Sequence, residues 1–151
     1  IVRDAPDVVY LIAGPGDDLE RLGDKARSLG VGNCVVFAGL VSEAEKIDHF
    51  RLADAFVMPS RGEGFGIVLL EALACGIPVV ASRADGGREA LADGEMGRLV
   101  DPDDGDDIRD AILAALAIPD RTVPEGLKQF SPTAFAQRVD KIIAGIKGGD
   151  P

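Results

Sequence analysis

Short, unbroken apolar runs alternate with segments of helical periodicity along the chain. Unbroken runs of this length, closed by Gly or Pro, are typical of strands that are buried on both faces of a parallel sheet. The predicted strands are VVYLIAG (8–14), CVVFAG (34–39), AFVMP (55–59), PVVAS (78–82) and the short GRLV (97–100). The segments between them predict helices over about 17–29, 42–53, 66–75, 87–92, 106–116 and 132–146. This alternation predicts an α/β fold, a three-layer Rossmann-like domain whose parallel sheet is covered by helices on both faces.

The helix after the third predicted strand carries one acid in an apolar setting. In the stretch EGFGIVLLEALACG (63–76), almost every residue from 66 to 75 is apolar except Glu71. An unpaired buried carboxylate is costly, so Glu71 needs a partner or a ligand. Three interpretations stay open: Glu71 binds a ligand, it pairs with Arg83 or Arg88, or the helix is less buried than its sequence suggests.

Ligands of parallel α/β sheets bind at the carboxyl ends of the strands, which directs attention to loops 14–18, 39–42 and 60–66. The third loop is rich in glycine and precedes a helix, so its backbone amides can approach an anion closely. The first loop contains Gly14 and Gly16, but Leu19 stands where a dinucleotide fingerprint has its third glycine. A hydride-transfer enzyme is therefore not favoured, and the P-loop pattern is also absent.

Composition narrows the class of protein. The 151 residues suit one globular domain, and the net charge of -10 argues against binding to nucleic acid. No apolar run approaches the ~20 residues of a membrane span. The start resembles no signal peptide, and its lack of an initiator Met suggests a piece of a longer protein.

The remaining polar and sulfur-bearing residues favour structural roles. Cys34 and Cys75 lie in apolar contexts and are interpreted as core thiols of a reducing compartment. His49 is interpreted as a helix-surface or hydrogen-bonded histidine, and no spacing suits a metal site. The acidic run 101–107 is interpreted as a turn and the charged start of a helix.

One long stretch, FVMPSRGEGFGIVLLEALACGIPVVAS, resembles the signature of the retaining glycosyltransferases of GT-B fold in glycosyltransferase family 4. That family has two glutamates separated by seven residues, followed by a Gly-x-Pro-Val-Val-Ala strand. In this chain they are Glu63, Glu71 and GIPVVA (76–81). Other stretches agree in the same order: PDVVYLIAGPG, VVFAGLVS, ADAFVMPS, GGREALADGEMGRLVDPDD and FSPTAFAQ.

The resemblance implies that residues 1–151 form a nucleotide-sugar-binding domain, the C-terminal half of a GT-B fold. The implied reaction moves a hexose, with retention of configuration, from a UDP-, GDP- or ADP-linked donor to a glycan, lipid or small acceptor. The nucleotide sugar is then a substrate, and neither a metal nor another cofactor is expected. Two alternatives are a nucleotide-sugar-binding regulatory module without catalysis and a GT-B nucleotide-sugar epimerase.

The resemblance also implies roles for particular residues. Glu71 would accept hydrogen bonds from the ribose hydroxyls, and Glu63 would contact the transferred sugar as the catalytic residue. The other implied donor-binding residues are the diphosphate-binding amides of Gly64, Phe65, Gly66 and Ile67, the base-contacting backbone of Leu40 and Val41, and Gly14 in the first loop. Glu43 is a weaker candidate for base selection.

The family usually supplies an Arg and a Lys for the diphosphate from a segment that would precede Ile1. The expected partner of this domain is its own N-terminal acceptor domain, which the chain lacks. A cytoplasmic location is expected, with peripheral contact to the inner membrane face only through that other domain.

Overall fold

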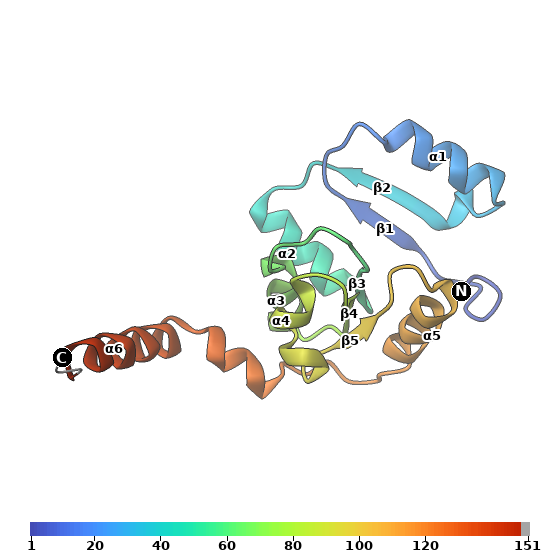
Figure 1. Ribbon diagram of the computed structural model, residues 1–151. Helices are drawn as coiled ribbons and strands as arrows, with labels where there is room; N and C mark the ends of the chain where they lie inside the picture. Colours follow the sequence, from blue (N-terminus) through green and yellow to red (C-terminus); the bar gives the residue numbers. More distant parts are fainter. Residues whose placement is uncertain (149–151) are drawn as a thin grey trace.

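The computed structural model describes residues 1–148, and its strands form two parallel sheets (Figure 1). The strands are β1 (Tyr10–Ala13), β2 (Val35–Gly39), β3 (Phe56–Met58), β4 (Val79–Ser82) and β5 (Arg98–Val100). One sheet pairs β1 with β2, and the other has the order β3-β4-β5. Each strand lies within one of the apolar runs that predicted it, so the α/β class and the parallel pairing are confirmed.

Every helix that the sequence predicts is present, with bounds shifted by a few residues. The α-helices are α1 (Leu19–Ser28), α2 (Glu43–Leu52), α3 (Ile67–Ala74), α4 (Gly87–Ala90), α5 (Gly105–Leu116) and α6 (Pro132–Gly148). Three 3-10 turns, which the sequence pattern does not predict, occupy Gly32–Cys34, Ala92–Gly94 and Glu125–Phe130. Figure 1 shows α6 extending away from the body of the molecule. No helix within residues 1–148 has the length and apolar character needed to cross a membrane.

Side-chain caps fix the starts of two helices. Ser42 and Glu45 form a capping box at α2, in which each side chain bonds the other residue's backbone amide. Asp104 caps α5 by accepting hydrogen bonds from the amides of Asp106 and Asp107. The interpretation of the acidic run as a turn and a helix start is thus confirmed.

The central strand β4 is covered by helices on both faces. All four of its residues are buried, and successive side chains point to opposite faces. Val79 and Ala81 join the core that α3 and α4 contribute to, whereas Val80 packs with Ala111 and Ala115 of α5. This sheet therefore forms the middle layer of the predicted three-layer arrangement.

The strands do not join into one continuous sheet, in contrast to the single sheet that the sequence suggested. Figure 1 places β1 between β2 and the sheet containing β3, but β1 forms a ladder only with β2. Side chains at the start of β1 are exposed: Val9, just before the strand, is 61% and Tyr10 is 53% exposed. An apolar run predicts a strand, but it does not reveal which strand will be its neighbour.

The glycine-rich loop that precedes α3 is held by the segment after β4. Asp85 Oδ2 accepts hydrogen bonds from Ser60 Oγ at 2.6 Å and from the Glu63 amide at 3.3 Å. The Gly86 amide donates to the Glu63 carbonyl at 2.9 Å. A Cβ atom on Gly86 would lie 2.1 Å from the Gly64 carbonyl oxygen, so the two backbones are closer than any side chain permits.

Replacing Gly86 with Ala should therefore separate the loop from the turn after β4. Relieving such an overlap costs about 1–3 kcal/mol, so the urea midpoint should fall. Gly62→Ala is a matched control in the same loop, because a Cβ there meets nothing within 4 Å. Equal midpoints for the two variants would show that the close approach does not position the loop.

Candidate functional site

The carboxylate of Glu63 lies over the N-terminus of α3. Its Oε1 accepts hydrogen bonds from the amides of Phe65 at 3.2 Å and Gly66 at 2.9 Å. Gly66 has a φ of +90°, a left-handed conformation that favours glycine, and it is the N-cap residue of α3. Two adjacent amides thus converge on one carboxylate oxygen, which is the geometry that binds oxyanions at helix N-termini.

The residues around Glu63 differ in how firmly they are anchored. Phe65 is half-buried, and its ring packs edge-on against Phe130 with 5.7 Å between ring centroids. Gly64 and Ile67 are exposed, so their backbone lies at the surface. Phe65 therefore fixes the loop to the core while the residues on either side stay accessible.

Glu71 forms an ion pair with Lys46 of α2. Lys46 Nζ lies 2.9 Å from Glu71 Oε1 and 2.8 Å from Glu43 Oε2. The hydrogen bonds that Lys46 donates to Glu43, first, and to Glu71 raise the pKa of Lys46, so this side chain stays protonated. The side chains of Lys46 and Glu71 are 26% and 34% exposed. The carboxylate is thus compensated at the edge of the core.

The structure contradicts one of the earlier interpretations of Glu71 and confirms another. Its partner is neither Arg83 nor Arg88, because those side chains pair with Asp107 and Asp93 instead. The helix is also less buried than its sequence suggests, since α3 buries one face and leaves Glu71 half-exposed. A helix packed on one side of a sheet needs only one apolar face, whatever the composition of the other.

Glu71 and Lys46 line a cavity of about 390 Å³ between α2 and α3, called here the α2–α3 cavity. Its lining residues are Glu43, Ala44, Lys46, Ile47, Phe50, Glu71, Ala74 and Cys75. The lining combines apolar side chains with three charged groups, a composition common to sites that bind small ligands. Lys46 is a residue of this cavity that the sequence pattern did not single out. Its spacing from Glu43 signals an ion pair on a helix surface, but only tertiary packing brings Glu71 to it.

The first two predicted loops lie together. The Gly14 amide donates to the Gly39 carbonyl at 2.8 Å, which joins the ends of β1 and β2. Leu40 is 79% exposed and Val41 is half-buried, and both directly precede the cap of α2. Helix α2 therefore begins at this pair of loops and contacts Glu71 through Lys46. Glu63 and the amides at the N-terminus of α3 do not line the α2–α3 cavity.

The two cysteines are free thiols and are half-buried rather than fully buried. Cys75 lines the α2–α3 cavity, and Cys34 ends a 3-10 turn before β2. His49 is satisfied as predicted, since its Nδ1 lies 2.7 Å from the Glu45 carbonyl oxygen. Among the residues that the structure describes, no cluster of three His, Cys, Asp or Glu side chains could hold a metal ion.

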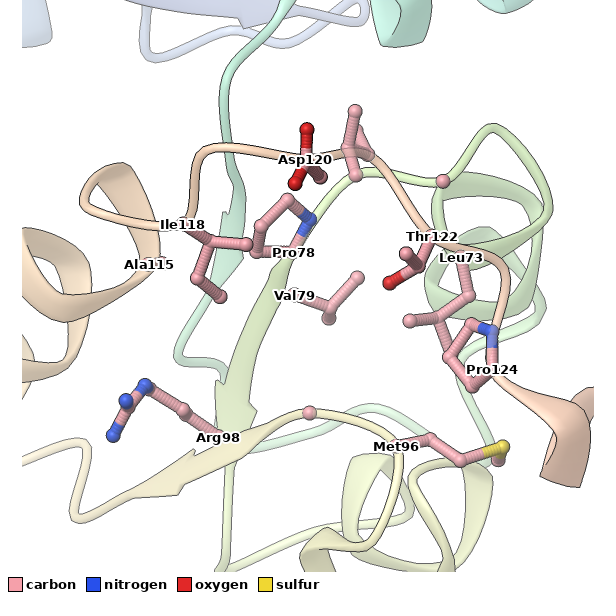
Figure 2. A pocket seen from close by; sticks show the side chains of 13 residues that line it. Leu73, Pro78, Val79, Met96, Arg98, Ala115, Ile118, Asp120, Thr122 and Pro124 are labelled. Atoms are coloured by element: carbon pink, nitrogen blue, oxygen red, sulfur yellow. The ribbon is translucent and has the colours of Figure 1, made fainter.

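A second, smaller cavity of about 130 Å³ lies at the amino end of β4, away from the carboxyl ends of the strands (Figure 2). Pro78 and Val79 at the start of this strand line it, together with Thr122 and Pro124 of the segment that follows α5. None of the predicted site residues lies here. The carboxyl ends of the strands, and not this cavity, are therefore the candidate site.

Comparison with known proteins places the chain in a family. The profile described as "Glycosyl transferases group 1" matches residues 1–134. The GDP-mannose-dependent alpha-(1-6)-phosphatidylinositol monomannoside mannosyltransferase of Mycolicibacterium smegmatis is 42% identical over 132 residues, which are 83% of this chain and 35% of that protein. The D-inositol 3-phosphate glycosyltransferase of Corynebacterium jeikeium is 39% identical over 84% of this chain and 32% of its own length. The chain thus spans about a third of these relatives.

Solved structures agree on the fold. Anabaena HepE, crystallised with UDP and glucose, superposes with a TM-score of 0.76 at 24% identity, over 91% of this chain and 41% of that one. The neighbours are glycosyltransferases of GT-B fold, as the resemblance implied. With its glutamate pair, its glycine-rich loop and a family match that covers most of its length, the chain belongs to the group 1 glycosyltransferases.

Proposed function

We propose that this chain is the donor-binding domain of a retaining glycosyltransferase, and that it binds a nucleoside-diphosphate hexose. The observation that carries the proposal is the position of Glu71. This acid lines the α2–α3 cavity and is separated by seven residues from Glu63, which lies over the N-terminus of the same helix. Glu63 therefore lies at the N-terminus of α3 and Glu71 lies within this helix, and the anion-binding turn stands between them in the sequence.

Glu71 would hold the ribose. Its Oε1 is bound by Lys46, and among the described residues no hydrogen bond is recorded to its Oε2. A ribose diol offers O–H donors to this carboxylate, and hydrogen bonds to a charged acceptor are the stronger kind. Lys46 orients the carboxylate of Glu71 and compensates its charge, so this compensation does not depend on the ligand.

The amides at the start of α3 would hold the diphosphate. The amides of Phe65 and Gly66 already converge on one carboxylate oxygen, and a phosphate oxygen has the same hydrogen-bonding demand. Glu63 would turn toward the hydroxyls of the transferred sugar and stabilise it electrostatically. Preorganised donors at the leaving diphosphate lower the barrier to its departure. No protein nucleophile and no metal or other cofactor enter this proposal.

The comparisons support a hexosyl donor. One similar protein is named for its dependence on GDP-mannose, and a structural neighbour was crystallised with UDP and glucose. Because this chain spans about a third of its relatives, we assign the acceptor site to a separate N-terminal domain of a longer enzyme. We place that enzyme in the cytoplasm, with any membrane contact made by the N-terminal domain.

In the longer enzyme, Glu71→Ala should lower transferase activity at least a hundredfold, because a neutral methyl group accepts nothing from the ribose. Glu71→Gln should be milder, since its amide oxygen still accepts one hydrogen bond. Glu125→Ala is the control, as Glu125 is an exposed acid paired only with Lys128. Steady-state transfer rates measure all three variants. Activity of Glu71→Ala near that of the unmodified enzyme would contradict the ribose role.

The isolated chain should bind nucleotide sugars weakly and transfer no sugar. Its net charge of -10 repels a diphosphate, and the acceptor site would lie on the other domain. Calorimetry with UDP- and GDP-hexoses, together with a coupled assay for released nucleotide, tests both statements. Measurable turnover by the purified chain would show that transfer does not require a separate acceptor domain, and the proposal would be wrong.

A further inference from the structure

We propose that Asp85 is a positioning residue for the transfer reaction, and that it sets where the carboxylate of Glu63 lies against the donor sugar. The proposal rests on the donor-binding function above, in which Glu63 contacts the transferred sugar. It stands on the hydrogen bonds by which the turn after β4 holds the backbone of Glu63 and the start of the loop that carries it.

The pairing of β3 with β4 brings Asp85 to the glycine-rich loop. These strands are parallel neighbours, with Met58 opposite Ala81, so their carboxyl ends lie at the same edge of the sheet. Ser60 follows shortly after β3, and Asp85 follows shortly after β4. Ser60 Oγ then donates a hydrogen bond to Asp85 Oδ2 at 2.6 Å. The contact between these two distant residues is therefore a consequence of strand pairing.

The backbone of Glu63 is bound on both sides by the turn after β4. Its amide donates to Asp85 Oδ2 at 3.3 Å, and its carbonyl accepts from the Gly86 amide at 2.9 Å. The side chain of Glu63 leaves from the Cα atom between these two groups, so the turn fixes the point from which the carboxylate reaches. A misplacement of about 1 Å can cost about a hundredfold in rate. The bonds to the turn are therefore expected to affect catalysis as well as folding.

The carboxylate of Asp85 is held in its orientation by its own turn. Its Oδ1 accepts a hydrogen bond from the Gly87 amide at 3.0 Å, so one oxygen binds the turn and the other binds the loop. The same turn begins at Ser82, which is fully buried and accepts a hydrogen bond from the Ala84 amide at 3.0 Å. Asp85 lines neither of the two cavities, so we assign it an action through Glu63 and not on the ligand.

Asp85→Asn tests this role with almost no change in side-chain volume. An ionised carboxylate accepts at both oxygens, whereas an amide has one acceptor and one NH₂ donor. In one orientation the NH₂ group would face the Glu63 amide, and in the other it would face the Gly87 amide, so one backbone hydrogen bond is lost either way. In the longer enzyme, kcat should fall about tenfold or more. Release of nucleotide from GDP-mannose or UDP-glucose measures it.

Nucleotide affinity separates positioning of Glu63 from a general loss of structure. The ring of Phe65 anchors the other end of the loop against Phe130, and Glu71 lies in the α2–α3 cavity. Asp85→Asn should therefore leave the affinities for GDP and UDP, measured by calorimetry, within about threefold of those of the unmodified enzyme. A damaged fold would lower these affinities together with kcat.

Two further variants keep the test from depending on one substitution. Ser60→Ala removes one of the two donors at Asp85 Oδ2, so it should lower kcat by a smaller factor than Asp85→Asn does. Asp104→Asn is the matched control, because Asp104 also accepts two backbone amides but does so at the start of α5. This control should leave kcat and both affinities unchanged.

A double-mutant cycle shows whether Asp85 acts through Glu63. Residues that act as a unit have effects on rate that do not add. In the Glu63→Ala background, Asp85→Asn should lower kcat by less than about threefold, since no carboxylate remains to be placed. The four rates of the cycle are measured under the same conditions as above.

The outcomes separate this proposal from the donor-binding function. If Asp85→Asn leaves kcat unchanged, or if its effect persists in full in the Glu63→Ala background, the positioning role is wrong and the donor-binding function stands. If Asp85→Asn weakens GDP and UDP as much as it lowers kcat, Asp85 supports the whole loop and the positioning role is also wrong. If Glu63→Ala leaves kcat unchanged, the roles of Glu63 and Asp85 are both wrong.

Discussion

The ion pair between Lys46 and Glu71 makes an acid compatible with an apolar helix. A carboxylate at the edge of a core loses part of its hydration, and a cation held against it offsets that loss. The pair also links α2, which follows the sheet of β1 and β2, to α3, which follows β3 of the other sheet. This contact compensates the charge and, together with the buried Phe50 of α2, holds α2 against the core to which α3 contributes.

Local sequence rules recovered the elements of this fold well. Each strand follows from an unbroken apolar run, and the capping box of Ser42 and Glu45 marks the start of α2 because its hydrogen bonds span only three residues. The split into two sheets could not be predicted in the same way. Strand pairing depends on contacts between distant segments, and an apolar run such as VVYLIAG is equally compatible with an edge and a central position.

In the candidate site, too, features set by neighbouring residues could be predicted, and contacts between distant segments could not. The glycines before α3 and the acid in its middle are visible in the sequence, so Glu63, Gly66 and Glu71 could be singled out. The partner of Glu71 could not, because Lys46 is 25 residues away and two arginines offered the same charge.

The contact between Gly86 and Gly64 has a consequence for protein engineering. The glycine-rich loop takes its shape from a turn that lies two elements later in the chain, through Asp85 and the Gly86 amide. A grafted copy of the 63–76 segment would therefore lose this support on a scaffold without a matching turn. To transplant the anion-binding turn, a designer would need to carry the segment after β4 along with it.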